Sequence, residues 1–383
     1  MRRALDVLAE KTQGKSFKTK SFCYEDYHSP DSIFEIPNYE IVPKDFGETN
    51  HISQPKNLFR FAQKIQGNPP LFSYFLDGSR RTYKIDDVQY GKRIYPIVAG
   101  QIGIGCCRRA KKELTIELFE QKIVLVLPEC ANANRERYFW ESLKSAVNKE
   151  STINSKYHIK IDEILYYADR EQEDYEDSAI IEIQNKMVDL EKKVVADMTR
   201  QRLLSQDKRL IKDGSLEYQK MKTGNYRDIS KIKNNYRWVV GVSKKFNPEM
   251  CVDNRKKSIA AKIAELPLYH RTPAFKFESL RSHGEEGAVY VTAWYLRIRD
   301  SKYTQSPFDG IVKVEKILIT DSEMSDGLET EEVDIICANL INERNPVCYK
   351  IDTRWANHLY PVYLTESFVK SRYLSNNHLI NAL

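Results

Sequence analysis

The stretch LFSYFLDGSRR, from Leu71 to Arg81, contains an apolar run that stops at an aspartate followed by Gly and Ser. A later stretch, KRLIKDGSLEY from Lys208 to Tyr218, ends an apolar run in the same way. An aspartate at the end of a strand projects its carboxylate beyond the sheet edge, where ligands of α/β proteins gather. Asp-Gly is also a favoured hairpin turn, so either stretch alone is weak evidence of a site. Together they predict that Asp77 and Asp213 end neighbouring strands and that their carboxylates converge.

The pattern around these stretches predicts the fold class. Turn residues separate three strand-like runs, Leu71–Leu76, Arg81–Asp86 and Arg93–Cys106, which predict an antiparallel meander. Further strands are expected at 122–128, 209–212, 237–245, 288–298 and 311–319, and helices at 3–11, 57–66, 136–148, 176–205, 330–342 and 363–374. A meander followed by strands that alternate with helices predicts an α/β protein with a mixed sheet flanked by helices.

Composition bounds the class of protein. Hydrophobic residues make up 41% of the 383 residues and charged residues 30%, which is typical of a globular chain with a sizeable core. No apolar run is long enough to span a membrane, and the basic N-terminus lacks the apolar block of a secretory signal. Seven scattered cysteines without a CxxC pair indicate reduced thiols, a cytoplasmic location and no zinc site.

The charges are unevenly distributed. Residues 200–262 hold 17 Lys and Arg against 6 Asp and Glu, whereas residues 163–197 hold 11 acidic against 4 basic residues. A basic block around Asp213 favours a polyanionic partner, of which nucleic acid is the commonest, although a solvated basic surface would give the same count. The residues expected to bind the nucleic acid backbone are Lys220, Lys222, Arg227, Lys231, Lys233 and Lys245.

Converging carboxylates predict a cation, since they would otherwise repel one another. Oxygen ligands favour Mn²⁺ or Mg²⁺, and paired ions held by carboxylates activate water and stabilise the leaving oxygen of a phosphodiester. Glu191 is a candidate third ligand, because it lies at the edge of the apolar stripe of the long helix over 176–205. The alternative is that Glu191 flanks the stripe and reaches water.

Other chemistries have weaker support. The chain lacks a GxxxxGK[ST] phosphate-binding loop and a GxSxG nucleophile elbow, so ATP hydrolysis and serine-hydrolase chemistry are not expected. The segment GQIGIG, Gly100–Gly105, has glycines at the spacing G-x-x-G-x-G, but it lies within a strand-like run. A role in holding phosphate is therefore not predicted.

The order of the motifs resembles that of the NurA nucleases. The first Asp-Gly-Ser is followed by a long helix bearing an acid, by a second Asp-Gly-Ser-Leu, by VVGVSKK at 239–245, and by LYPVYLTESF at 359–368. The resemblance runs from about Leu71 to the C-terminus. It divides the chain into an N-terminal irregular or helical extension at 1–56 and a NurA-like nuclease domain at 57–383.

The resemblance implies an RNase H-like core and a manganese-dependent deoxyribonuclease, both exonuclease (5′ to 3′) and endonuclease. It also implies a homodimer that works with HerA, a hexameric DNA-translocating ATPase, in DNA-end processing or defence against phage. By position, Asp77 and Asp213 match the metal-binding aspartates, Glu191 matches the helix glutamate, and Lys244 matches a lysine that could hold a phosphate. Tyr360 and Pro361 match the pair that introduces the last helix.

The chain departs from the family after Glu366. Family members commonly carry Ala-His there, and this sequence has Ser367 and Phe368. His358 is a candidate replacement, although an isolated histidine is more often structural. The alternative hypotheses are therefore a catalytically silent NurA-like subunit that clamps DNA or docks on the motor, and an RNA nuclease that shares the same core.

Overall fold

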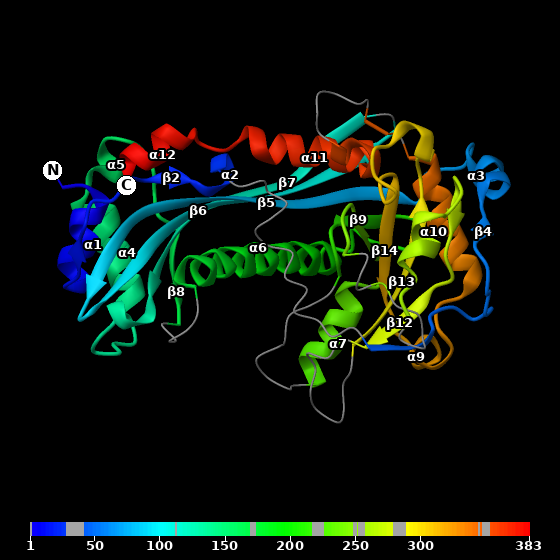
Figure 1. Cartoon of the computed structure of the whole chain (residues 1–383), viewed down its shortest axis with the longest axis horizontal. Coiled ribbons are helices and arrows are strands. Elements are labelled where there is room, and N and C mark those ends of the chain that lie inside the picture. Colours follow the sequence, from blue (N-terminus) through cyan, green and yellow to red (C-terminus); the bar gives the residue numbers. More distant parts are fainter. Residues whose placement is uncertain are drawn as a thin grey trace.

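The computed structural model describes residues 2–27, 42–111, 113–168, 174–216, 226–247, 251, 257–278, 289–343, 345–346 and 353–383. A single 14-stranded mixed sheet runs through these residues, with helices on both faces (Figure 1). The strand order along the main path is β3-β12-β13-β14-β10-β9-β5-β6-β7-β8, while β1, β2, β4 and β11 pair at the margins. This confirms the predicted α/β class.

Three central strands are unusually long: β5 (Phe72–Tyr90), β6 (Arg93–Ala110) and β7 (Glu113–Pro128). Shorter strands on the same path are β8 (Glu163–Tyr167), β9 (Arg209–Asp213) and β10 (Val239–Ser243). The remaining strands are β1 (Lys15–Ser16), β2 (Phe22–Cys23), β3 (Val42–Phe46), β4 (Lys56–Asn57), β11 (His270–Arg271), β12 (Phe275–Glu278), β13 (Tyr290–Arg297) and β14 (Ile311–Ile317).

The longest helix is α6 (Tyr175–Arg200), and α10 (Thr330–Asn342) and α11 (Tyr360–Ser371) follow the last strands of the sheet. The other helices are α1 (Ala4–Thr12), α2 (Tyr24–Tyr27), α3 (Phe59–Ile65), α4 (Phe139–Glu150), α5 (Thr152–Ser155), α7 (Tyr226–Asn235), α8 (Ala260–Ala264), α9 (Asp321–Asp326) and α12 (Asn376–Ala382). Short 3₁₀ turns, η1 (Glu129–Ala131), η3 (Ser301–Tyr303) and η4 (Thr353–Asn357), complete the described elements. None of the described helices combines the length and the apolar composition needed to cross a bilayer.

The five central strands have the topology of an RNase H-like core. β5, β6 and β7 form an antiparallel meander, and β9 then pairs parallel to β5 while β10 pairs parallel to β9. Numbered along the chain, these strands lie in the order 3-2-1-4-5, and the connection from the meander to β9 passes through α6. The α6 crossover is the kind of connection that a strand parallel to β5 needs, because a tight turn can join only antiparallel neighbours.

The first Asp-Gly-Ser does not end a strand, which corrects the expectation of two short strands at 71–76 and 81–86. β5 runs unbroken through Asp77, which pairs with Gly105 of β6, and Gly78, which pairs with Ile104. What ends here is the pairing on the other side, because β9 accompanies β5 only as far as Leu76, opposite Lys212. From Asp77 to Thr82 this edge of β5 therefore has no strand partner among the described residues, and β2 takes it up again at Tyr83 and Lys84.

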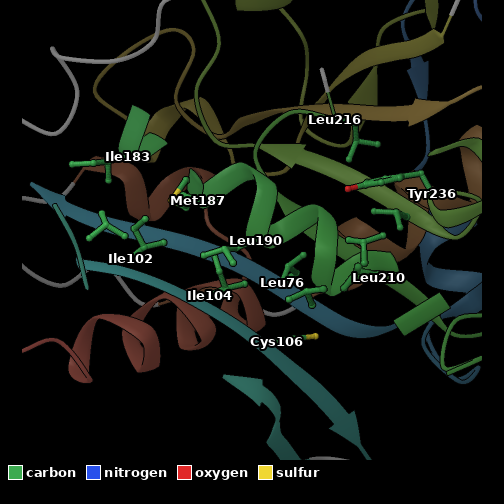
Figure 2. Packing of buried hydrophobic residues seen from close by; sticks show 14 of the residues in the cluster. Leu76, Ile102, Ile104, Cys106, Ile183, Met187, Leu190, Leu210, Leu216 and Tyr236 are labelled. Carbon is green, nitrogen blue, oxygen red and sulfur yellow. The ribbon is translucent and has the colours of Figure 1, made fainter. Parts of the chain in front are cut away.

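One face of the central sheet is covered by α6 (Figure 1). The predicted stripe of α6, which includes Ile183, Met187 and Leu190, packs against Leu76 and Ile104 and their neighbours in one buried cluster (Figure 2). Burying each such side chain stabilises the fold by about 1.5–3 kcal/mol. The helix begins at an N-cap, where the Asp174 side chain accepts hydrogen bonds from two backbone N–H groups.

The opposite face is covered by α11 and α12 (Figure 1). The glycines of β6 allow helices to approach the sheet closely on both faces. A Cβ atom at Gly103 or Gly105 would lie only 2.6 or 2.5 Å from the Val369 side chain of α11, which is too close for a side chain there. A Cβ at Gly100 would lie 2.9 Å from Ile183 of α6. The glycines of the GQIGIG segment thus allow α6 and α11 to pack closely against β6.

Adding a side chain at Gly105 is expected to destabilise the protein. Gly105→Ala should cost about 1–3 kcal/mol of unfolding free energy, since Val369 has to move. The matched control is Gly67→Ala, because no atom lies within 4 Å of a Cβ built there. Urea unfolding measures both, and equal stability of the two variants would contradict this account of α11 packing.

Candidate metal centre

Three carboxylates from three elements meet at the open edge of β5. Asp77 comes from the middle of β5, Asp213 from the last position of β9, and Glu366 from α11. One oxygen of each lies within 4.8 Å of the others, a separation at which a single ion can contact all three. Side chains alternate between the two faces of a strand, so Asp77, like its partner Gly105, faces α11, where Glu366 lies.

The turn after Asp213 is held in place by two buried groups. Gly214 has a φ of +86°, a left-handed conformation that a glycine adopts without strain. Glu315 of β14 accepts hydrogen bonds from the Ser215 hydroxyl at 2.7 Å and the Leu216 N–H at 2.6 Å. The Lys212 ammonium donates to the Asp213 carbonyl at 3.0 Å. The second Asp-Gly-Ser is therefore a fixed turn, unlike the first.

The Lys244 ammonium lies between two of the carboxylates. Its Nζ is 2.8 Å from Asp213 Oδ2 and 2.9 Å from Glu366 Oε2. Lys244 directly follows β10, the parallel neighbour of β9, and this adjacency brings it to Asp213. Burial lowers the pKa of Lys244, but Asp213, Glu366 and Asp77 more than offset this and hold the pKa above its usual value. The lysine is therefore a fixed positive charge in the cluster.

Asp77 is the least satisfied member of the cluster. It is 4% exposed, and its Oδ2 has no hydrogen-bond partner among the described residues. Burial raises the pKa of Asp77 well above its ordinary value, and the neighbouring Asp213 raises it further. An unpartnered oxygen beside two further carboxylates fits a hard divalent ion such as Mn²⁺ or Mg²⁺, which takes oxygen ligands.

Glu366 is surrounded by cations. Besides Lys244, it accepts from Lys370 at 2.5 Å, and His358 Nε2 lies 3.5 Å from its Oε2. Burial alone would raise the pKa of Glu366, but Lys244 and Lys370 hold it well below its usual range. The structure thus places His358, which is 2% exposed, against Glu366 of α11.

Glu191 approaches the same point from the α6 side and lies outside the group of three. It is 3% exposed, and its carboxylate pairs with Lys212 at 3.0 Å. A Cβ at Gly78 would lie 2.4 Å from Glu191 Oε1, so the glycine after Asp77 gives Glu191 its space. Glu191 therefore balances Lys212 beside the cluster, and it is not a flank residue reaching water.

The remaining candidates are spread more widely. Tyr360 is 37% exposed at the start of α11, as expected for a Tyr-Pro pair that introduces the helix. In α7, Lys231 is exposed and Lys233 donates to the Met324 sulfur. Lys245 is half-buried after β10. Lys220, Lys222 and the side chain of Arg227 lie outside the described residues.

Sequence reasoning did not identify the supporting groups Lys212, Glu315 and Lys370. Lys212 and Glu315 each interrupt an apolar strand with a charge, and a charge at a buried strand position is a recognisable signal for a buried partner. Lys370 follows Glu366 by four residues on a helix, the spacing of an intrahelical ion pair.

The chain is similar in structure to a NurA nuclease. The match is to the crystal structure of the NurA nuclease from Sulfolobus solfataricus, with a TM-score of 0.36 and 11% identity over 81% of this chain and 86% of that chain. No protein-family model matches the sequence, and no curated protein matches it.

Removing the Lys244 charge is expected to tighten divalent-ion binding. Because the ammonium contacts two of the three carboxylates, it competes for the position a divalent ion would take. Lys244→Met should therefore lower the Kd for Mn²⁺ at least about 10-fold in calorimetry. Lys245→Met, at the next position, is the control and should leave the Kd unchanged. Weaker or unchanged binding by Lys244→Met would contradict the competition.

Proposed function

We propose that the chain is a divalent-metal-dependent nuclease that hydrolyses DNA phosphodiesters. The observation that carries the proposal is the meeting of Asp77, Asp213 and Glu366 within 4.8 Å at the open edge of an RNase H-like core. Clustered carboxylates that lower the stability of a fold are common where a cation and a phosphate are bound. The buried, unpartnered oxygen of Asp77 supports a ligand role over a purely structural one.

Each residue of the cluster has a role in this proposal. Asp77, Asp213 and Glu366 would hold Mn²⁺ or Mg²⁺, which when bound supplies Lewis-acid activation of water and charge stabilisation at the phosphate. Lys244 binds a phosphate oxygen, because the carboxylates it contacts are then shared with the ions. His358 and Lys370 orient Glu366, and the Glu191–Lys212 pair ties α6 to the end of β9 beside it.

A nucleic acid is the proposed polymer because of the basic block that surrounds Asp213, and DNA is the kind that the motif resemblance implies. In α7, Lys231 is exposed and available to a phosphate backbone, and Lys233, two residues later, is half-buried. Lys220, Lys222, Arg227 and Lys245 extend the proposed path along the sequence. Clustered cations of this kind bind nucleic acid without reading its sequence.

The wider assignments rest on the motif resemblance. We propose a homodimer that works with a HerA-like hexameric DNA-translocating ATPase, cuts with 5′-to-3′ polarity, and acts in DNA-end processing or phage defence. An ATPase gene adjacent to this one, and co-purification of the two products, would support the partnership. A chain that stays monomeric and binds no such ATPase would remove it.

A catalytically silent subunit is the second candidate, favoured by two observations. Lys244 already contacts both Asp213 and Glu366, and Phe368 stands where the family has a histidine. A silent subunit would bind DNA but would take up Mn²⁺ poorly even with all three carboxylates intact. Calorimetric titration with Mn²⁺ distinguishes the two candidates.

Loss of either aspartate is expected to abolish cleavage. Asp77→Asn and Asp213→Asn should each lower the rate of linear-DNA degradation in Mn²⁺ by at least about 100-fold, because each removes a charged ligand. Asp189→Asn is the control, since Asp189 lies on the solvent side of α6 with its side chain 69% exposed. Degradation by the aspartate variants at the rate of the control would refute the nuclease assignment.

Neutralising the cations of α7 is expected to weaken DNA binding and its salt dependence. The double variant Lys231→Gln/Lys233→Gln should reduce the slope of log K against log salt by about 1–2, as expected for the loss of one or two phosphate contacts. Fluorescence anisotropy over a series of salt concentrations measures this. Lys302→Gln, at a side chain that is 63% exposed, serves as the control. An unchanged slope in the double variant would exclude α7 from the DNA path.

A further inference from the structure

We propose that Tyr360 and Tyr363, at the start of α11, form a stacking platform for unpaired bases of the strand whose phosphodiester reaches the three carboxylates. This inference rests on the proposed nuclease function and names its substrate class, a DNA strand with unpaired bases at the site of cleavage. It assigns a role to Tyr363, which the sequence analysis did not single out, and a specific role to Tyr360.

The two tyrosines form an exposed aromatic pair. They are 37% and 40% exposed, their ring centroids lie 6.4 Å apart, and their planes differ by 24°. Leu359 and Val362, on the other side of the same turn, are buried in the cluster that includes Trp294 and Val314. The helix is thus anchored by its apolar side while both rings face solvent.

The platform is linked to the candidate metal centre through His358. The ring of Tyr363 meets the ring of His358 edge-on at 5.8 Å, and His358 Nε2 lies 3.5 Å from Glu366 Oε2. Tyr360, Tyr363 and Glu366 follow one another at intervals of three residues, about 4.5 Å of rise each on a helix. Tyr360 therefore lies about 9 Å along the axis from Glu366, a span of about two to three stacked nucleotides.

The charges around the platform suit a nucleic acid strand. Lys370, near the end of α11, and Arg372, its C-cap residue, are both exposed, and the Arg372 guanidinium lies over the Phe368 ring at 4.8 Å. Glu366 is the one acidic residue of α11, and it is turned into the cluster. Aromatic rings with cations beside them bind single strands by stacking on bases and neutralising phosphates, with little regard to sequence.

The platform is tested by binding, without cleavage. The parent protein carries Asp77→Asn, and its affinity is measured by anisotropy for a labelled DNA duplex with a short single-stranded tail. Separate duplexes carry the tail at the 5′ and the 3′ end, and for each tail a matched abasic version keeps the phosphates and removes the bases. Stacking predicts at least about 10-fold tighter binding of the base-bearing tail at one end or both.

Substitution of the tyrosines should remove this preference. In the double variant Tyr360→Leu/Tyr363→Leu the base-bearing and abasic tails should bind equally, whereas Tyr360→Phe/Tyr363→Phe should retain the preference because the rings remain. The control is Tyr138→Leu, at a tyrosine before α4 that is 67% exposed. Equal binding of the two tails by the parent, or a preference that survives in the double leucine variant, would overturn the platform.

This experiment separates the platform from the nuclease assignment. A protein that cleaves linear DNA in Mn²⁺ but shows no preference for base-bearing tails keeps the nuclease function and loses the platform. A protein that binds base-bearing tails through the two tyrosines but never cleaves keeps the platform and loses the nuclease function, and would then be the silent DNA-binding subunit.

Discussion

Three carboxylates within 4.8 Å of one another repel, and the structure around Asp77, Asp213 and Glu366 is arranged to offset that repulsion. Lys244 bridges Asp213 and Glu366, Lys370 also pairs with Glu366, and the Lys212–Glu191 pair adds no net charge beside them. The oxygen of Asp77 that has no partner among the described residues is the one place where this compensation is incomplete. The candidate centre is therefore preorganised for a further cation.

The convergence of these residues depends on the order of the strands. β9 runs parallel to β5, and the last pair between them joins Lys212 to Leu76. The next residue of each strand, Asp213 and Asp77, therefore comes to lie beside the other. β10 is parallel to β9, so the residue that follows it, Lys244, reaches the same edge. The glycines at 103 and 105 then let α11 come close enough to bring Glu366 over the gap. Topology supplies two of the carboxylates, and helix packing supplies the third.

The sequence predicted the α/β class and the meeting of Asp77 with Asp213, because apolar runs that end in Asp-Gly-Ser report on strand ends and turns. It could not predict that β5 continues through its own Asp-Gly-Ser, since Gly78 and a turn glycine such as Gly214 look alike in a sequence. Nor could the sequence show that Glu366, and not Glu191, is the third carboxylate of the cluster. That choice depends on which helix approaches each face, and close approach is set by glycines on a different strand.

A purely structural role does not account for the cluster of three carboxylates. Replacing a buried ion pair by apolar side chains of similar volume is often neutral or stabilising, so stability alone does not account for three acids with an incompletely satisfied oxygen. Asp77 in particular lies within a strand whose neighbours Phe75 and Leu76 are fully buried, and its burial raises the pKa of its carboxyl group. A fold that places an unsatisfied carboxylate in such surroundings loses stability, and a bound cation would offset that loss.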